Sequence, residues 1–153
     1  MAKLLVDGET MRAAAVEQFV MNGWVDTAPF EQLLDLTIES AEAGAARLSM
    51  PFKVKHAQGG GVMHGGAITT LADTAVAMAI KSVLPPDTIF ATTELKTSFV
   101  APMRQGTIVA EARIEGPRGR SFFGEAKVLD ADGNLVAQFS SVFRVARGQG
   151  FED

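Results

Sequence analysis

Four residues in one short segment have the types and spacing needed for acyl-transfer chemistry. His64 is followed by Gly65 and Gly66, and Asp73 comes nine residues after the histidine. The run Gly65–Ile80 is otherwise apolar, which predicts a helix buried on all sides, and a carboxylate inside it is costly unless it is paired or used. Two glycines at a helix start leave backbone N–H groups open to close approach by a ligand. A donor cluster and a lone buried acid on one element predict catalysis.

The elements around this segment follow the order of an α+β protein with an antiparallel sheet. We expect a helix over Glu9–Asn22, a short helix over Phe30–Leu34, and then a hairpin that turns at Gly44. The central helix, at about residues 65–81, is followed by the helix-ending sequence Pro85-Pro86-Asp87. Four strand patterns come next: Thr88–Val100, Thr107–Glu115, Ser121–Asp130 and Leu135–Val145. A sheet wrapped around one apolar helix buries it on most sides, and dimerisation would cover the outer face and edges of the sheet.

Length, charge and cysteine content exclude several classes of protein. The 153 residues predict one domain over residues 1–153, with an N-terminal helical extension over residues 1–35. A net charge of −4 argues against nucleic-acid binding by charge, and the central apolar run is shorter than the ~20 residues of a membrane span. Without cysteine there is no disulfide or thiolate nucleophile, which fits a cytoplasmic location. His56 and His64 lack acids at ligand spacing, so no metal site is expected.

Four motifs together carry a family resemblance: Gly61-Val62-Met63-His64-Gly65-Gly66, Leu71-Ala72-Asp73, Phe99-Val100-Ala101-Pro102 and Asp132-Gly133-Asn134-Leu135-Val136-Ala137. With the order of elements, they resemble the hotdog-fold acyl-CoA thioesterases, in particular the phenylacetic-acid-pathway (PaaI-like) branch. The resemblance covers roughly Leu34 to Val145. It implies hydrolysis of an acyl-CoA or aryl-CoA to the free acid and coenzyme A, by a homodimer or a dimer of dimers, with no cofactor beyond the coenzyme A of the substrate.

The resemblance also assigns catalytic roles. It implies that Asp73 is the catalytic carboxylate, acting as general base on water or as nucleophile. The backbone N–H of Gly66 would polarise the thioester carbonyl, and His64 would shape the turn before the helix. Gln58 stands where the family usually has an asparagine that positions water, and it keeps the amide but adds a methylene.

Substrate binding has its own candidate residues. Gly65 leaves room beside the reacting group, and a hydroxyl near the start of the next strand often assists in the family. The phosphates of coenzyme A need cationic partners, which turns at the pocket mouth can supply. The candidates are Gly65, Thr92, Thr93, Arg118, Arg120 and Ser121.

The residues themselves support thioester chemistry. Helix N-terminal N–H groups stabilise the charge that develops on the carbonyl oxygen, and an apolar environment should raise the pKa of Asp73 and make it a stronger base. Nine residues at ~100° each amount to half a turn net. His64 and Asp73 should then face opposite ways and belong to different pockets. We therefore expect a composite site in a two-fold dimer, with Gln58, His64 and Gly66 from one chain and Asp73 from the other.

Other interpretations remain open at this point. Asp73 could be a structural acid bonded to Thr69 or Thr70, and His64 a satisfied turn histidine. A hotdog hydratase or dehydratase of acyl thioesters is one rival function, although it would need a histidine and an acid in one pocket. The other is a non-catalytic acyl-CoA-binding or sensing module, which would tolerate loss of Asp73.

Overall fold

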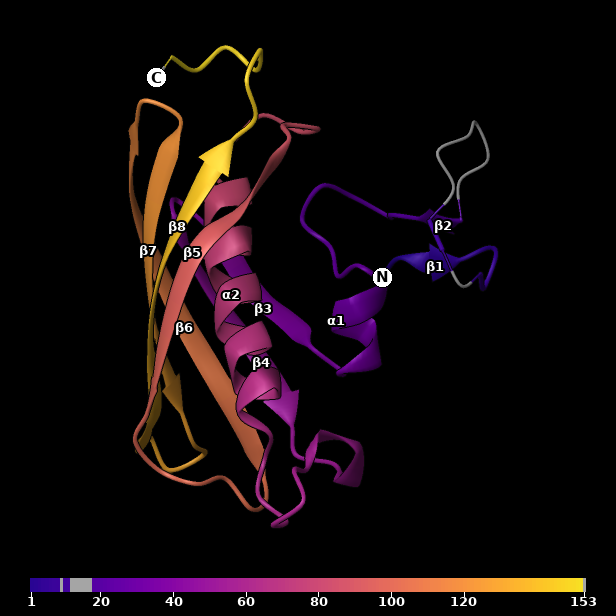
Figure 1. Ribbon diagram of the computed structural model, residues 1–153, viewed down its shortest axis with the longest axis vertical. Coiled ribbons are helices and arrows are strands. Elements are labelled where there is room, and N and C mark those ends of the chain that lie inside the picture. The colour runs from indigo at the N-terminus through magenta and orange to yellow at the C-terminus, as the bar shows by residue number, and fades with distance from the viewer. Residues whose placement is uncertain (9, 12–17, 153) are drawn as a thin grey trace.

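One long helix lies against one face of a six-stranded antiparallel sheet in the computed structural model of this chain (Figure 1). The structure describes residues 1–8, 10, 11 and 18–152. Its elements are, in chain order, β1 (Lys3–Leu4), β2 (Phe19–Val20), α1 (Pro29–Leu33), β3 (Thr37–Glu42), β4 (Ala45–Pro51), the 3₁₀ helix η1 (Val54–His56), α2 (Gly65–Lys81), β5 (Phe90–Phe99), β6 (Thr107–Arg118), β7 (Ser121–Leu129) and β8 (Leu135–Val145). This is the α+β arrangement that the sequence predicts, with α2 where the central helix was expected.

The strand order places β3 and β5 at the two edges of the main sheet. The order is β3-β4-β6-β7-β8-β5, and every neighbouring pair is antiparallel. Alternate residues point toward α2, so each inner strand has one apolar face. The core between sheet and helix contains Leu48, Met50, Ile108 and Val128 from the sheet and Leu71, Val76 and Ile80 from α2, all with no exposed surface. No helix in the described ranges is long and apolar enough to cross a membrane.

The hairpin predicted at Gly44 is present, and one strand is longer than expected. Ala43 and Gly44 both have positive φ, at 50° and 79°, which is the backbone of a tight two-residue hairpin turn. The strand expected to end at Glu115 continues to Arg118, because the ladder between β6 and β7 shifts register and then resumes at Arg118. Pro117 has no N–H to donate, and the irregularity accommodates it.

The N-terminal region differs from the prediction. The helix expected over Glu9–Asn22 is wrong at Phe19–Val20, which form β2 and pair with Lys3–Leu4; residues 9 and 12–17 of that range lie outside the described residues. Backbone pairing with the start of the chain overrides local helix propensity here. The short helix is confirmed as α1, one residue earlier than expected at each end.

The N-terminal region is also tied to the end of α2 by two side chains, those of Trp24 and Lys81. The Trp24 indole N–H donates to the Lys81 carbonyl at 2.9 Å. The Lys81 ammonium in turn donates to the Trp24 carbonyl at 3.0 Å and lies 4.7 Å from the centre of the indole ring. These contacts hold Trp24 beside the helix that carries the candidate catalytic acid.

Candidate active site

The helix α2 is open along one side, which corrects the expectation that it is buried all round. Gly66 is exposed, and the neighbouring residues of the same side are partly exposed: Gly65, Thr69, Thr70, Asp73 and Ala77. They recur at three- and four-residue spacing, so they form one stripe along the helix, which we call the open stripe. The sheet covers the other sides of α2. The open stripe lies beside edge strand β5, since the hydroxyl oxygens of Thr69 and Thr97 are 2.9 Å apart.

Asp73 is half-buried in the middle of the open stripe. Its Oδ1 accepts a hydrogen bond from the Thr92 hydroxyl at 2.9 Å. Burial raises the pKa of the Asp73 carboxyl, the hydrogen bond from Thr92 opposes that shift, and the negative charge of Glu31 adds to it. The raised pKa is the direction predicted from the sequence. An acid with a raised pKa is a better general base once it is ionised.

Thr69 and Thr70, which could have made Asp73 a structural acid, form their hydrogen bonds with other partners. The Thr70 hydroxyl donates to the Gly66 carbonyl at 2.8 Å, and Thr69 pairs with Thr97 on β5. Neither bond satisfies Asp73, whose hydroxyl partner comes from another element of the fold. The carboxylate is therefore held against β5 with its open side toward solvent.

The start of α2 is organised by His64. Its Nδ1 accepts the Gly66 N–H at 2.8 Å, and its carbonyl accepts the N–H groups of Ala67 and Ile68 at 2.9 and 3.3 Å. His64 is thus the helix N-cap, and its ring is exposed. The Gly66 N–H, which the family resemblance assigns to the substrate carbonyl, donates to this cap in the structure.

Gly65 lies directly under the side chain of Phe99. A Cβ at this position would lie 2.8 Å from Cζ of Phe99, at the end of β5. The Phe99 ring, itself 56% exposed, therefore lies over the first turn of α2. This places an apolar surface next to the helix N-terminal donors.

The loop before α2 holds Gln58 at the surface. The Gln58 side-chain oxygen accepts the N–H of Gly60, and its carbonyl accepts the N–H of Gly61 at 2.9 Å. Gln58 therefore shapes its own glycine-rich loop. The buried His56 uses both ring nitrogens structurally, accepting the Lys53 N–H at Nδ1 and contacting the Leu34 carbonyl at Nε2. In the part of the chain that the structure describes, no three His, Asp or Glu side chains gather as metal ligands would.

The remaining predicted residues lie away from Asp73. The Thr93 hydroxyl donates to the Val142 carbonyl, so of the two candidate threonines it is Thr92 that contacts the acid. Arg120 is buried and donates to the Val145 carbonyl at 2.9 Å, whereas Arg118 is exposed and lies over the Phe123 ring. Arg118, Arg120 and Ser121 form the β6–β7 hairpin, which Figure 1 shows at the end of the sheet opposite the start of α2.

Gly66 and Asp73 lie on the same side of α2 but far apart along it. Seven residues at 1.5 Å each separate them by about 10 Å along the helix axis. A reacting carbonyl carbon has to lie about 3 Å from both the base or nucleophile and the oxyanion donor. One chain therefore supplies two half-sites, an acid next to β5 and a donor cluster at the helix start.

Two residues near the site were missed by sequence reasoning. Glu31 influences Asp73 from α1, 42 positions earlier in the chain, and no local pattern connects them. Phe99 was noted only as part of a motif, and its contact with Gly65 depends on where β5 ends relative to α2. Both effects depend on the tertiary structure.

Known proteins that resemble this chain point to one family. The family model described as the thioesterase superfamily matches residues 60–137. A protein of Halobacterium salinarum that is named as an esterase is 32% identical over 139 residues, which are 84% of this chain and 91% of the relative. A conserved protein of Pseudomonas aeruginosa has a structure with a TM-score of 0.75 and 29% identity, covering 78% of this chain and 95% of that one. The phenylacetic acid degradation protein PaaI of Thermus thermophilus has a TM-score of 0.69 and 27% identity, covering 76% and 99%.

Proposed function

This chain belongs to the thioesterase superfamily, and from that premise we propose that it hydrolyses an acyl-CoA or aryl-CoA thioester to the free acid and coenzyme A. Its fold is the hotdog fold and its likeness is to the PaaI-like branch, as the sequence predicts. Membership of this superfamily supports the hydrolysis of thioesters as a class of reaction. The single observation that carries the proposal for this chain is the half-buried Asp73, held by Thr92 with a raised pKa on an otherwise uncharged helix side.

The active site we propose is formed by two chains. The half-sites of one chain are about 10 Å apart along α2, so one chain cannot place both on the same carbonyl. Edge strand β5 runs beside the open stripe, and an exposed edge of ten residues is a template for pairing with a second strand. Its apolar side chains Leu95 and Phe99, with the adjacent Val100, are each about half exposed. Pairing of two β5 edges about a two-fold axis would bring Asp73 of one chain toward Gln58, His64 and Gly66 of the other.

The chemistry follows from the charges that develop. Ionised Asp73 removes a proton from water, the water oxygen forms a bond to the thioester carbonyl carbon, and the carbonyl π electrons move onto its oxygen. The N-terminus of α2 stabilises that oxyanion. The electron pair of the oxyanion then re-forms the carbonyl while the carbon–sulfur bond breaks with its electron pair on sulfur. The thiolate takes a proton from solvent, and Asp73 releases its proton to solvent and is ionised again. Direct attack by the Asp73 carboxylate, followed by hydrolysis of the anhydride, uses the same groups.

His64 and Arg118 have supporting roles in this proposal. Because His64 Nδ1 holds the Gly66 N–H, substrate binding exchanges the imidazole for the thioester oxygen as acceptor. The exposed Arg118 is the better candidate for the phosphates of coenzyme A, since the Arg120 guanidinium is buried and bonded to Val145. Gln58 would have to release Gly60 to orient water.

The first experiment measures thiol release from phenylacetyl-, short-, medium- and long-chain acyl-CoA by the wild type and by Asp73→Asn. The asparagine keeps the size of the side chain and an acceptor for Thr92, so the fold is maintained while the base is lost. We expect the rate to fall by about 10²–10⁴-fold. Asp132→Asn, at an exposed turn, is the matched control and should retain full activity. Wild type that binds acyl-CoA without turnover would instead establish the binding module.

A second experiment tests the two-chain site. Gly66→Pro removes the donor N–H at a first-turn position where proline is tolerated, and Asp73→Asn removes the acid. Each variant alone should be inactive. Co-expressed, half of the dimers would be mixed and each mixed dimer would contain one intact site, so about a quarter of wild-type activity should return. Absence of recovery, in mixed dimers confirmed by mass spectrometry, would show that both groups act within one chain.

A further inference from the structure

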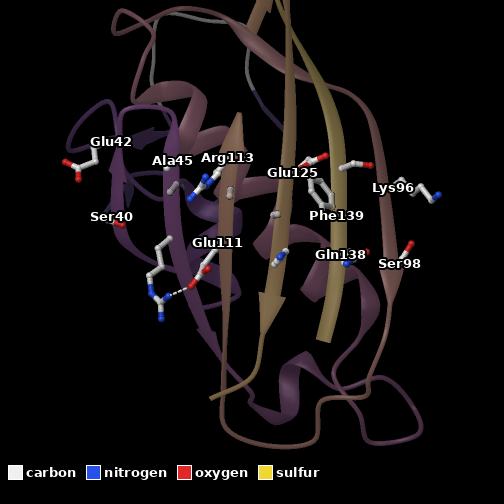
Figure 2. Close-up of a pocket in the computed structure, with 16 residues that line it drawn as sticks. Ser40, Glu42, Ala45, Lys96, Ser98, Glu111, Arg113, Glu125, Gln138 and Phe139 are labelled. Atoms are coloured by element: carbon white, nitrogen blue, oxygen red, sulfur yellow. Dashed lines mark hydrogen bonds and ion pairs between the residues drawn. The ribbon is translucent and has the colours of Figure 1, made fainter. Parts of the chain in front are cut away.

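An acyl group whose carbonyl lies at Asp73 needs an apolar place on the same side of the sheet as the acid. The groove that Figure 2 shows lies on the opposite side, on the face of the main sheet that points away from α2, and it is lined by charged side chains such as Glu111, Arg113 and Lys127. Covering charged groups with an apolar chain would remove them from water without a partner. The candidate place is therefore the seam between the open stripe of α2 and β5, where Asp73 itself lies.

Contacts between α2 and β5 recur along this seam at four-residue spacing on the helix. From the start of α2, these contacts are Gly65 with Phe99, Thr69 with Thr97, and Asp73 with Thr92. The next position in the series is Ala77, which is partly exposed. Its methyl group fills less of the seam than the side chains before it, so the room for a ligand lies directly after the acid.

Aromatic side chains bound the space over Ala77. Phe90, at the start of β5, is partly buried, and its ring meets the Trp24 ring edge-on with 6.4 Å between the ring centres. The indole is fixed in place by Lys81, because its N–H donates to the Lys81 carbonyl at 2.9 Å and its ring lies beside the Lys81 ammonium. Lys81 follows Asp73 by eight residues, which is about 12 Å along the helix axis, so the indole lies two turns beyond the acid.

The charges beyond the acid offset each other. Glu31 on α1 interacts electrostatically with both Asp73 and Lys81, so α1 borders the same side of the helix. The partly buried Lys81 ammonium donates to the Trp24 carbonyl at 3.0 Å. One carboxylate and one ammonium leave this space without net charge, which suits an uncharged acyl group, since a second carboxylate brought in with the substrate would be buried without a partner of its own.

We propose that Trp24 ends an acyl-binding subsite that begins at Asp73 and passes over Ala77. The inference rests on the proposed function, because it takes the reacting carbonyl to lie at Asp73. An acyl group that fits between the acid and the indole is uncharged and is either short or a single ring. A longer chain has to displace the indole from Lys81 or leave its apolar end in water, and both are unfavourable. Trp24 therefore sets the limit on the length of the acyl group.

The fluorescence of Trp24 reports on the subsite directly, because the chain has one tryptophan. The titration uses the Asp73→Asn protein, in which turnover should be slow, and adds coenzyme A, butyryl-CoA or octanoyl-CoA. Coenzyme A alone is the control for quenching by the adenine ring. We expect octanoyl-CoA, whose chain is long enough to reach the indole, to shift the emission to shorter wavelength, and coenzyme A to leave it in place. An emission maximum that octanoyl-CoA does not move would overturn the proposal.

Two substitutions should move the length limit in opposite directions. Trp24→Ala removes the end of the subsite, so the ratio of kcat/KM for dodecanoyl-CoA to that for butyryl-CoA should rise by about tenfold or more. Ala77→Leu fills the subsite from the helix, so the ratio for octanoyl-CoA to butyryl-CoA should fall by about tenfold. A general disturbance of the site would lower kcat/KM for all chain lengths together. Unchanged ratios in both variants would therefore refute the subsite.

Trp24→Phe separates the ring from its hydrogen bond to Lys81. Phenylalanine keeps an aromatic ring and lacks the N–H, so its ratios should stay close to those of the wild type; ratios like those of Trp24→Ala would assign the effect to the hydrogen bond and contradict the proposal. Phe30→Ala, which removes a 58% exposed ring from α1, is the matched control and should change neither ratio. Thiol release by the wild type tests the proposed function, and Trp24 emission tests the subsite. A chain that binds octanoyl-CoA against Trp24 without turnover would keep the subsite and refute the thioesterase.

Discussion

The contact between Gly124 and Val76 should control both the stability of the fold and the position of the catalytic acid. Gly124 is buried in β7, and a Cβ on it would lie 2.2 Å from Cγ1 of Val76 and 3.0 Å from Cγ2. That is about 1.2 Å short of the 3.4 Å where ordinary van der Waals contact begins. Val76 has no exposed surface, and the Ser141 hydroxyl oxygen lies 3.1 Å from the same Cβ. We therefore expect Gly124→Ala to displace Val76 and, with it, α2.

We expect this substitution to cost about 1–3 kcal/mol of unfolding free energy, as overpacking of a filled core does. For a chain of this size the loss corresponds to a fall in Tm of about 2–12 °C. Asp73 lies three residues before Val76 on the same helix, and a displacement of about 1 Å at a reacting group can cost up to ~10²-fold in rate. Gly124→Ala should therefore lower thiol release even under conditions where the protein is fully folded.

Val76→Ala is the matched second change, because it removes both γ carbons that the new Cβ would strike. Alone it loses a buried side chain and about 1.5–3 kcal/mol. Combined with Gly124→Ala it should restore the helix position, so the double variant should be more stable than the sum of the single effects and regain activity. Chemical denaturation and thiol release on all four proteins form a double-mutant cycle. An additive cycle, or an unchanged Tm in Gly124→Ala, would refute the reasoning.

Three further outcomes follow from the site. Because burial raises the pKa of Asp73, the folded chain holds that proton more tightly than the unfolded chain, so stability falls as pH rises through the raised pKa. Asp73→Asn should therefore have a higher melting temperature than the wild type at pH 7, and this difference should disappear toward pH ~4. Calorimetry at both pH values checks this, and a lower melting temperature of the variant at pH 7 would contradict it. His64→Ala removes the N-cap of α2 and should cost about 0.5–2 kcal/mol in chemical denaturation, whereas an unchanged midpoint would mean that the cap bond contributes nothing. Arg118→Ala should raise KM for acyl-CoA and leave kcat unchanged, and a truncated thioester without phosphates should show no difference from wild type; an equal rise in KM for both substrates would exclude a phosphate contact.

The fold could be predicted from the sequence because its elements are encoded by local periodicity and turn chemistry. The alternation of apolar residues along Thr107–Glu115 predicts a strand from local sequence alone. The glycine after Ala43 permits the positive φ of a tight turn. The nearly uncharged run around Asp73 gives a helix that is buried except along the open stripe. The failure at Phe19–Val20 has the opposite cause, because those residues pair with a strand sixteen positions away and local propensity does not report that pairing.

The types of residue at the candidate site could be predicted from the sequence, whereas the contacts between them could be predicted only in part. Asp73 and the glycines of the helix start are identifiable because a lone charge and a flexible helix start are unusual in such a run. The occupation of the Gly66 N–H by His64, and the influence of Glu31 on Asp73, depend on a ring orientation and on the packing of α1. Neither has a signature in the order of residues.

The sequence by itself determined the central helix, the strands of the main sheet, and which residue carries the charge within that helix. Only the tertiary structure decided which side of that helix stays open and which threonine reaches Asp73. The ladder between β5 and β8 shifts register between Thr92 and Glu94, which leaves Thr93 as an extra residue and reverses the alternation of faces beyond it. A shift of one residue turns every later side chain to the opposite face. The partner of the acid is therefore fixed by strand pairing and not by the local pattern of the strand.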